Sequence, residues 1–430
     1  MKTHTNTQPK SKLAFPGYSW IIVLLSGLIL FFSGPGQTYN VSVFIDSYIE
    51  SEGWSRSAIS GFYSAATLTA GLLMPFSGRL IDKKGHRFMT PVIAGSLALA
   101  CFWMSFMQAP WMLVLGFVMI RLFGQGSMTL LSTTLTPQWF HRKQGIALSI
   151  ASLGGVAGPA LIPIISTYLI LHYGASLAWR FWAFWLLALM VPLAALLIRN
   201  RPEDIGMAPD GRMAYEADSK DITSSKETNP TAPMTPDWEP GDATKTRTFW
   251  MMIYCMLVPS MITTGITFHI VSIISEKGFP VTFAALILSI TAMVQLPVTF
   301  LIGWACDRFP VYKLKAFNYL LMAAAILLLL YSPTKPFLIL YAVIHGISIS
   351  ADHVSTSAWW PGNFGRKHLA TIRGMGMTAM VIGSALGPLP FGFAYDTFGD
   401  YQFILLTMLL FPLLAFGAAL ISPPPQKSSN

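Results

Sequence analysis

The feature that most constrains this chain is a series of twelve apolar stretches, each about 20 residues long or longer. They lie at 18–45, 56–80, 89–107, 110–135, 144–172, 177–199, 248–275, 280–305, 315–332, 335–358, 372–394 and 399–421. A helix of about 20 apolar residues crosses the hydrocarbon layer of a membrane. Only 11% of the residues are charged, against roughly 25% in soluble domains. The sequence therefore predicts an all-α membrane protein with twelve transmembrane helices.

One long hydrophilic stretch, residues 200–247, divides the predicted helices into six and six. It is rich in Pro, Asp, Thr and Lys, a composition typical of a linker that cannot build a core of its own. The predicted organisation is a tail at 1–17, a six-helix bundle at 18–199, the linker at 200–247, a second six-helix bundle at 248–421 and a tail at 422–430.

The basic residues are distributed unevenly between the two sides of the membrane. They gather in the N-terminal tail and in the loops after the second, fourth, eighth and tenth helices, whereas the opposite loops hold Arg56, Arg180, Lys277 and Lys335. Basic loops mark the cytoplasmic side. We therefore expect a multi-pass protein of the cell membrane with both termini and the linker in the cytoplasm. This topology accounts for the net charge of +9 without a nucleic-acid partner.

Short motifs recur in the same order in the two halves. PQWFHRK (137–143) and PGNFGRK (361–367) share Pro-x-x-Phe-x-Arg-Lys at a distance of 224 residues. GRLID (78–82) and GWACD (303–307) share Gly-x-x-x-Asp at a distance of 225 residues. Their constant order and spacing indicate that the halves are duplicates.

A second repeated pattern is Gly-x3-Gly-Pro in the fifth and eleventh helices. Gly154, Gly158 and Pro159 are matched by Gly383, Gly387 and Pro388. We expect both copies to bring helices into close contact. Because each half has six helices, the repeats are parallel, an arrangement of secondary transporters that bind solute near the membrane midplane between the halves. We expect helices one, four, seven and ten to line the cavity.

Four segments resemble motifs of the major facilitator superfamily. GRLIDKKGHR (78–87) is similar to its loop motif between helices two and three, and GWACDRFPVYK (303–313) to the second copy of that motif. RLFGQG (121–126) resembles its arginine motif of helix four, and GVAGP (155–159) its Gly-Pro motif of helix five, found in antiporters. The resemblance implies two six-helix bundles that alternate between two open states. It also implies a gating loop motif, comprising Gly78, Asp82, Gly85, Arg87, Asp307 and Arg308.

Within that superfamily, two segments resemble most the monocarboxylate and oxalate–formate porter branch. They are PQWFHRKQGIALSIASLGGVAGP (137–159) and RPEDIGMAPDG (201–211). However, the arginine that such porters commonly carry in the eighth helix is replaced here by Gln295, and Tyr39 stands near the usual place of a lysine in the first helix. A neutral or differently placed solute therefore stays an alternative.

Polar residues inside the predicted helices are the candidates for contact with solute or protons, because charges at membrane depth are costly and usually functional. Helical spacing places Arg121, Gln125, Met128 and Ser132 on one face of the fourth helix. It places His345, Ser348, Asp352 and Ser355 on one face of the tenth. The complete candidate set is Arg121, His345, Asp352, His353, Tyr39, Asn40, His269 and Gln295.

Asp352 is the only acid well inside a helix of the second half, and His345 lies two turns away on the same face. Histidine changes its charge near neutral pH, so Asp352 with His345 or His353 is a candidate proton carrier. The alternatives are structural: Arg121 bonded to neighbouring helices, a buried pair without a transport role, and His269 bonded to an adjacent helix.

The predicted function is secondary active transport of a small organic solute, a small carboxylate by resemblance, driven by a proton or exchange gradient. The alternative is a proton-coupled efflux antiporter for drugs or other neutral or amphipathic compounds. The sequence contains no nucleotide-binding loop and no paired catalytic motif, so no enzyme activity is predicted. Its cysteines lack metal-ligand spacing, so neither cofactor nor metal is expected. The expected partners of a monomeric chain are solute, protons and the lipid bilayer.

Overall fold

The computed structural model describes residues 17–140, 144–208, 212–213, 238–306, 308–332, 334–365, 369–423 and 425. Within these residues, twelve helical segments are long and apolar enough to cross a membrane. They coincide closely with the apolar stretches of the sequence, so the predicted twelve-helix architecture is confirmed.

The first half contains six spans, several of which are interrupted. Its elements are α1 (Tyr18–Phe32), η1 (Gly34–Gly36), α2 (Thr38–Val41), η2 (Ser42–Phe44), α3 (Ile45–Glu52), α4 (Arg56–Lys84), α5 (His86–Met104), α6 (Pro110–Ile120), η3 (Arg121–Met128), α7 (Thr129–Trp139), α8 (Gln144–Tyr173), α9 (Ala175–Trp185), η4 (Leu186–Met190) and α10 (Val191–Leu197). The first span is not one helix, because Pro35 lacks the N–H that an α-helix needs. The chain passes through 3-10 turns there.

The linker and the second half follow. The described part of the linker contains η5 (Pro202–Ile205), β1 (Met207–Ala208), β2 (Arg212–Met213) and α12 (Pro240–Ala243). The second half contains α13 (Arg247–Glu276), α14 (Val281–Cys306), α15 (Val311–Tyr331), α16 (Lys335–Phe364), α17 (Leu369–Leu386), α18 (Pro388–Phe398) and α19 (Gln402–Leu420). The two strands pair antiparallel, with Met207 opposite Met213.

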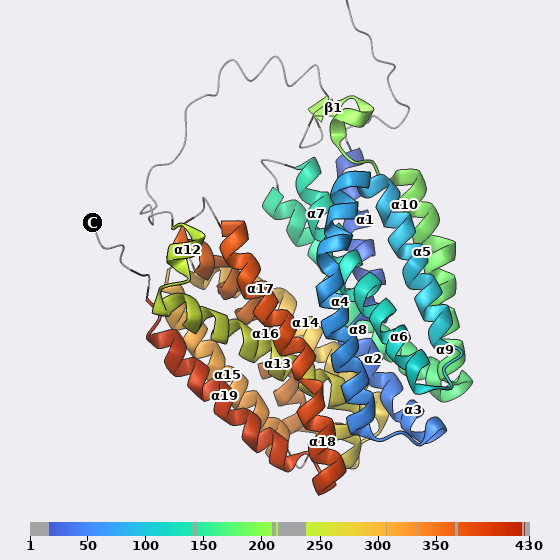
Figure 1. Cartoon of the computed structure of the whole chain (residues 1–430), viewed down its shortest axis with the longest axis vertical. Coiled ribbons are helices and arrows are strands. Elements are labelled where there is room, and N and C mark those ends of the chain that lie inside the picture. The colour runs from blue at the N-terminus through green and yellow to red at the C-terminus, as the bar shows by residue number, and fades with distance from the viewer. Residues whose placement is uncertain are drawn as a thin grey trace, which may run out of the picture.

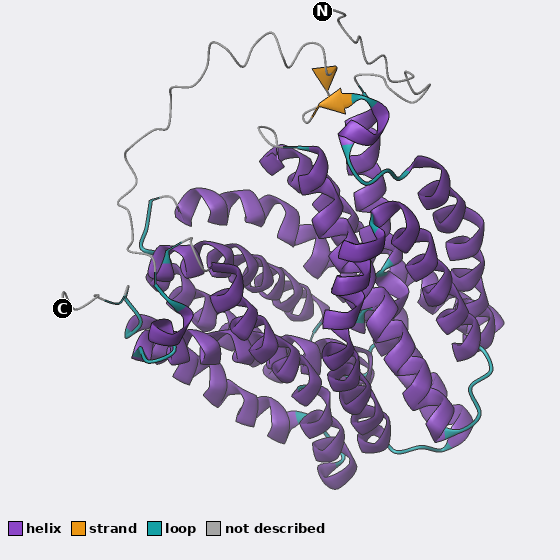
Figure 2. Ribbon diagram, turned by 45° about the horizontal axis from the view of Figure 1, so that its top comes forward, coloured by secondary structure: helices purple, strands orange, loops and turns teal. Residues whose placement is uncertain are grey.

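The two halves lie side by side as separate bundles (Figure 1). They approach each other at the end where α3 and α18 lie and diverge toward the end where α7, α12 and β1 lie. Figure 2 shows the strand pair at this second end of an otherwise helical molecule. We call the end with α12 and β1 the linker side and the opposite end the far side.

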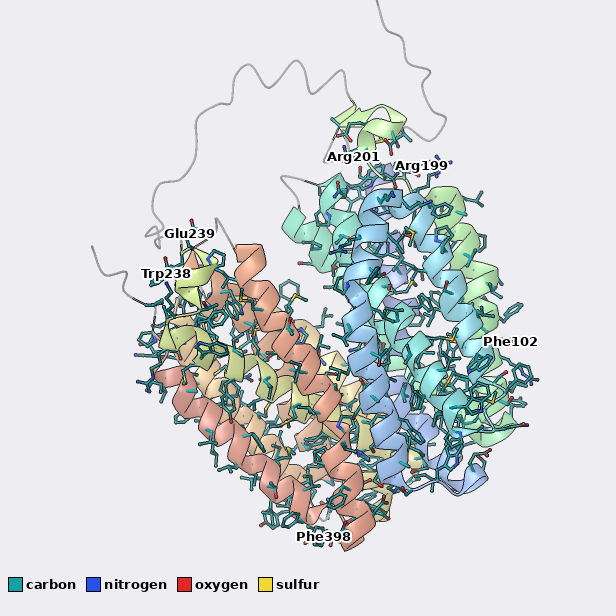
Figure 3. All side chains as sticks on the ribbon, viewed as in Figure 1. Phe102, Arg199, Arg201, Trp238, Glu239 and Phe398 are labelled. Carbon is teal, nitrogen blue, oxygen red and sulfur yellow. The ribbon has the colours of Figure 1, made fainter. Side chains whose placement is uncertain are left out.

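The linker joins both bundles on the same side. Figure 3 places Arg199 and Arg201 near β1 and Trp238 and Glu239 near α12, whereas Phe398 lies at the far side. The backbone N–H of Trp238 donates to the carbonyl oxygen of Phe364 at 3.1 Å, so the end of the linker is attached to α16.

The main contacts between the bundles are two pairs of helices that are related by the internal repeat. The second span, α4, packs against α17 and α18 of the second half, and the fifth span, α8, packs against α14. These contacts join the second span to the eleventh and the fifth span to the eighth. The repeat relates the second span to the eighth and the fifth to the eleventh, so it converts one contact into the other. The duplication seen in the sequence is thus repeated in the packing.

The glycines of the repeated Gly-x3-Gly-Pro pattern lie at close helix crossings. A Cβ atom at Gly154 of α8 would lie 1.8 Å from the carbonyl oxygen of Gly27 on α1. In the second half, a Cβ atom at Gly383 would lie 2.5 Å from the carbonyl oxygen of Leu257 on α13, and one at Gly387 would lie 2.3 Å from that of Met261. Both copies therefore allow two backbones to touch.

We expect Gly154→Ala to destabilise the protein, because the added methyl group must push two helix backbones apart. Overpacking of this kind typically costs about 1–3 kcal/mol. Thermal unfolding of the purified protein should show a clearly lower midpoint. Gly417→Ala on α19 is the matched control, because no atom lies within 4 Å of its Cβ position. Equal midpoints for the two variants would contradict the close crossing.

Candidate functional site

A cavity of about 280 Å³ lies between the two halves. Its wall comes from the break in the first span, η3, α8, α13, α14 and α16. The fifth and eighth spans therefore join the predicted first, fourth, seventh and tenth. The wall holds three glutamines, five threonines, two tyrosines and two histidines, and none of its described residues is Asp, Glu, Lys or Arg. The wall is thus rich in polar side chains, and its described part carries no fixed charge.

The break in the first span places two of the predicted residues differently. Tyr39 lines the cavity. Asn40 is fully buried behind it, where its amide donates to the carbonyl oxygen of Pro35 at 3.2 Å and its side-chain oxygen accepts from Ser166 at 2.6 Å. Asn40 thus stabilises the backbone of the break through these hydrogen bonds and does not line the cavity.

Arg121 is buried directly behind the cavity wall. Its guanidinium donates to the hydroxyl oxygen of Thr38 at 3.3 Å and lies over the ring of Tyr63 at 4.9 Å. Thr38 itself lines the cavity. The Nε–H of Arg121 has no hydrogen-bond partner among the described residues, and none of their ion pairs includes Arg121. A buried positive charge therefore stands next to the cavity without a carboxylate.

The fourth span departs from the regular helix on which its predicted polar face depends. Residues Arg121–Met128 form a π-helix, whose wider turns change the direction of the side chains that follow. As a result Gln125 lines the cavity, whereas Met128 is fully buried and Ser132 donates to the carbonyl oxygen of Ser26 at 2.7 Å.

On α16, the two histidines and the acid are directed differently. His345 and His353 line the cavity. Asp352 is directed toward α15, where its carboxylate accepts from the ammonium of Lys315 at 2.5 Å and from the amide of Asn318 at 3.3 Å. The ion partner of Asp352 is therefore Lys315, not His345. Helical spacing places the two side chains within about 20° of each other, but it does not identify the neighbour that the carboxylate meets.

Lys315 is a residue that the sequence reasoning missed. It is completely buried, and its ammonium also donates to the hydroxyl oxygen of Thr356 at 2.5 Å. The side chain of Asp352 is 19% exposed. Lys315 and Asn318 lie three residues apart on one face of α15, as a polar pair in an apolar helix, and that signal could have identified them.

Of the remaining candidates, Gln295 lines the cavity and His269 does not. The imidazole of His269 contacts the carbonyl oxygen of Pro388 through Nε2 at 3.0 Å and the hydroxyl of Tyr401 through Nδ1 at 3.1 Å. A carbonyl oxygen can only accept, so Nε2 carries the hydrogen, and Nδ1 of the neutral ring then accepts from the hydroxyl of Tyr401. His269 is therefore bonded to neighbouring helices.

The residues of the gating loop motif lie at the linker side, and their described contacts stay within one half. Gly85 has a φ of +79° and ends α4, and the backbone N–H of Arg87 donates to the side chain of Asn200 at 2.9 Å. The guanidinium of Arg308 lies 4.3 Å from the ring centre of Trp304. Gly78 and Asp82 lie in the last turns of α4, but the side chain of Asp82 and all of Asp307 lie outside the described residues.

Charged groups join the two halves on the far side, which the sequence reasoning did not foresee. Arg56 and Asp46 of the first half form an ion pair at 2.8 Å, and both bond to Ser272 on α13, with 3.0 Å between its hydroxyl and Asp46. The N–H of Ser57, near the start of α4, donates to the carboxylate of Asp396 on α18 at 2.8 Å.

The hydroxyl of Ser60 on α4 also meets Nε2 of His269 at 3.1 Å. We call this group the far-side contacts; its members are Asp46, Arg56, Ser57, Ser60, His269, Ser272 and Asp396. They bring the bundles together where Figure 1 shows them closest.

Two curated relatives match parts of the sequence. The riboflavin transporter RibJ of Trypanosoma brucei brucei is 27% identical over 164 residues, which is 37% of this chain and 29% of RibJ. The multidrug resistance protein MdtG of Salmonella arizonae is 31% identical over 139 residues, which is 31% of this chain and 34% of MdtG. The match thus spans about a third of each relative.

Solved structures of transporters share the fold over nearly the whole chain. A bacterial homologue of the human lysosomal transporter Spinster, in an inward-facing and occupied conformation, has a TM-score of 0.71 at 14% identity and covers 94% of this chain and 97% of its own. The nucleoside transporter NupG has a TM-score of 0.69 at 14% identity, covering 93% and 98%.

The family model described as Major Facilitator Superfamily matches residues 20–335 and 278–430. Its match extends over almost all of the sequence and agrees with the twelve spans, the two bundles and the cavity between them. The chain belongs to the major facilitator superfamily of membrane transporters.

Proposed function

We propose that this transporter moves a small organic anion, a carboxylate, through the cavity between its halves by alternating access. The observation that carries this proposal is the buried guanidinium of Arg121, which has no acidic partner among the described residues. A buried charge is unfavourable unless it is paired, and a carboxylate in the cavity would supply the missing charge. The cavity volume of about 280 Å³ suits a small solute, since pockets for drug-sized ligands begin at about that volume.

The energy source in this proposal is a proton gradient, with Asp352 as the proton-binding group. The carboxylate is partly exposed, whereas its counter-ion Lys315 is completely buried. If Asp352 takes up a proton, the ammonium keeps its bond to Thr356 and is not left without a partner. The ammonium nevertheless loses its counter-charge, which is costly for a buried ion, so protonation of Asp352 would favour a different arrangement of the pair, as coupling to transport requires.

In this proposal the linker side faces the cytoplasm and the protein lies in the cell membrane, because the loops on that side are the basic ones. The far-side contacts would then close the cavity to the outside. The monocarboxylate and oxalate–formate porters remain the proposed branch.

A second candidate is efflux of neutral or amphipathic compounds. It is favoured by the absence of charged side chains among the described residues that line the cavity and by the similarity to MdtG. Under this alternative Arg121 is a structural residue that ties the fourth span to Thr38 and Tyr63.

Counterflow in proteoliposomes should separate these two candidates. We expect labelled small carboxylates to exchange through the wild-type protein, and Arg121→Gln to weaken that exchange about 10- to 100-fold, which is the loss of a hydrogen bond to a charged group. Arg121→Lys should retain part of the activity. The control is Arg180→Gln, because Arg180 bonds to Ser105 and lies outside the cavity. Exchange of neutral compounds that is insensitive to Arg121 would favour the second candidate.

A further inference from the structure

The cavity wall contains three glutamine side chains, and the orientation of their amides limits what a solute can offer them. Gln37 comes from the break in the first span, Gln125 from η3 and Gln295 from α14. An amide presents either its NH2 group, a donor, or its oxygen, an acceptor. Which end faces the cavity follows from the bonds that each amide makes to the protein.

The NH2 group of Gln37 is held by the protein. It lies 3.1 Å from the hydroxyl oxygen of Ser33 and 3.4 Å from that of Thr129. The hydrogen of the Ser33 hydroxyl is donated to the carbonyl oxygen of Leu30 at 2.7 Å, so Ser33 can only accept from Gln37. Both amide hydrogens are therefore used, and the oxygen of Gln37 is the end left for a ligand.

The other two glutamines are held differently. The NH2 group of Gln295 donates one hydrogen to the carbonyl oxygen of Thr291 at 3.3 Å, and this bond leaves the side-chain oxygen and the second amide hydrogen for a ligand. The side-chain oxygen of Gln125 is buried below the wall surface and has no partner among the described residues, so it is not an acceptor that the cavity presents.

Two threonine hydroxyls of the wall also direct their hydrogens away from the cavity. Thr264 donates to the hydroxyl oxygen of Ser384 at 3.1 Å, and Thr291 donates to the carbonyl oxygen of Ile287 at 2.8 Å. What these hydroxyls offer to a solute is their lone pairs. Together with the side-chain oxygens of Gln37 and Gln295, they make this part of the wall rich in acceptors.

We propose that the transported solute carries hydrogen-bond donors that these acceptors bind, so that its class is a hydroxylated compound, such as a hydroxy acid, and not a plain carboxylate. The inference rests on the proposed function only in taking this cavity as the transport site. The guanidinium of Arg121 would balance the charge of the acid group, and the glutamine oxygens would accept hydrogen bonds from the hydroxyl groups.

The test is a ligand panel measured on the purified full chain by thermal shift and by competition. It contains three- to six-carbon 2-hydroxy acids, each beside its 2-methoxy and deoxy analogues, and the uncharged amides of the same hydroxy acids. We expect the hydroxy acids to stabilise the protein and the methoxy and deoxy analogues to bind about tenfold more weakly, because they leave the acceptors unpaired. Methoxy or deoxy analogues that bind equally well would overturn the inference, as would a panel in which no hydroxylated member binds.

Variants of one acceptor connect this preference to the wall. Gln295→Met keeps the length of the side chain and removes its oxygen, so the preference for hydroxy over methoxy compounds should shrink by several-fold. Gln402→Met, at the exposed start of α19, should leave that preference unchanged. If the uncharged hydroxy amides bind as well as the acids, the donor preference stands while the proposed carboxylate fails, so the two proposals can fail separately.

Discussion

Replacing Asp352 with Asn should abolish the accumulation of solute driven by a pH difference while leaving exchange close to the wild-type rate. Asparagine is similar in shape and can still accept from Lys315 and Asn318, but it cannot take up a proton. For one proton per solute, a difference of one pH unit corresponds to about 1.4 kcal/mol, or about tenfold accumulation. The variant should show no accumulation above the passive level in vesicles with an imposed pH difference.

A charge-matched double variant controls for the buried ammonium that Asp352→Asn leaves without its counter-charge. Breaking a buried pair from one side typically costs about 3–5 kcal/mol, whereas replacing both partners can be nearly neutral. Lys315→Met combined with Asp352→Asn should therefore recover the thermal stability that Asp352→Asn loses and keep exchange, but still show no accumulation. If Asp352→Asn vesicles still accumulate solute when a pH difference is imposed, Asp352 is not the proton carrier.

Replacing Arg56 with Met should shift the protein toward a conformation that is open on the far side. Arg56 joins Asp46 and Ser272 and lies 4.6 Å from the ring centre of Tyr395 on α18. Its removal takes away the contacts to Ser272 and Tyr395, which join the two halves only while the far side is closed. A loss of about 2 kcal/mol would change the ratio of the two states about 30-fold.

Cysteine labelling measures this shift. In a background without native cysteines, Thr267→Cys in the cavity wall should react at least tenfold faster with a membrane-impermeant reagent from the far side when Arg56→Met is present. Arg180→Met is the matched control, because this far-side arginine bonds only within the first half, to Ser105 and the ring of Phe106. Equal labelling of both variants would show that Arg56 does not hold the far side closed.

The sequence predicted the architecture because its strongest signals act along the chain. Twelve apolar stretches and the order of the repeated motifs were sufficient for two six-helix bundles with a cavity between them. Gly34, Pro35 and Gly36 form the break that brings Tyr39 to the cavity. Each of these features is a local property, so no knowledge of the neighbouring helices was required.

The partners of individual side chains were harder to predict, because helical spacing gives a direction and not a neighbour. Asp352 is predicted to act with His345 or His353, yet its carboxylate bonds to Lys315, the first residue of the predicted ninth helix. The far-side contacts join residues more than 200 positions apart, such as Arg56 and Ser272. Pairing of this kind depends on how the two bundles meet, and the sequence pattern carries no direct signal for it.

The π-helix in the fourth span has a consequence for how the two ends of that span can move. A π turn holds one residue more than an α turn, and one residue corresponds to about 100° of rotation about the helix axis. If Arg121–Met128 relaxed to α geometry, α7 would turn by roughly that angle relative to α6 without a break in the chain. The linker-side end of the span can thus rotate about the helix axis while the far-side end stays in place.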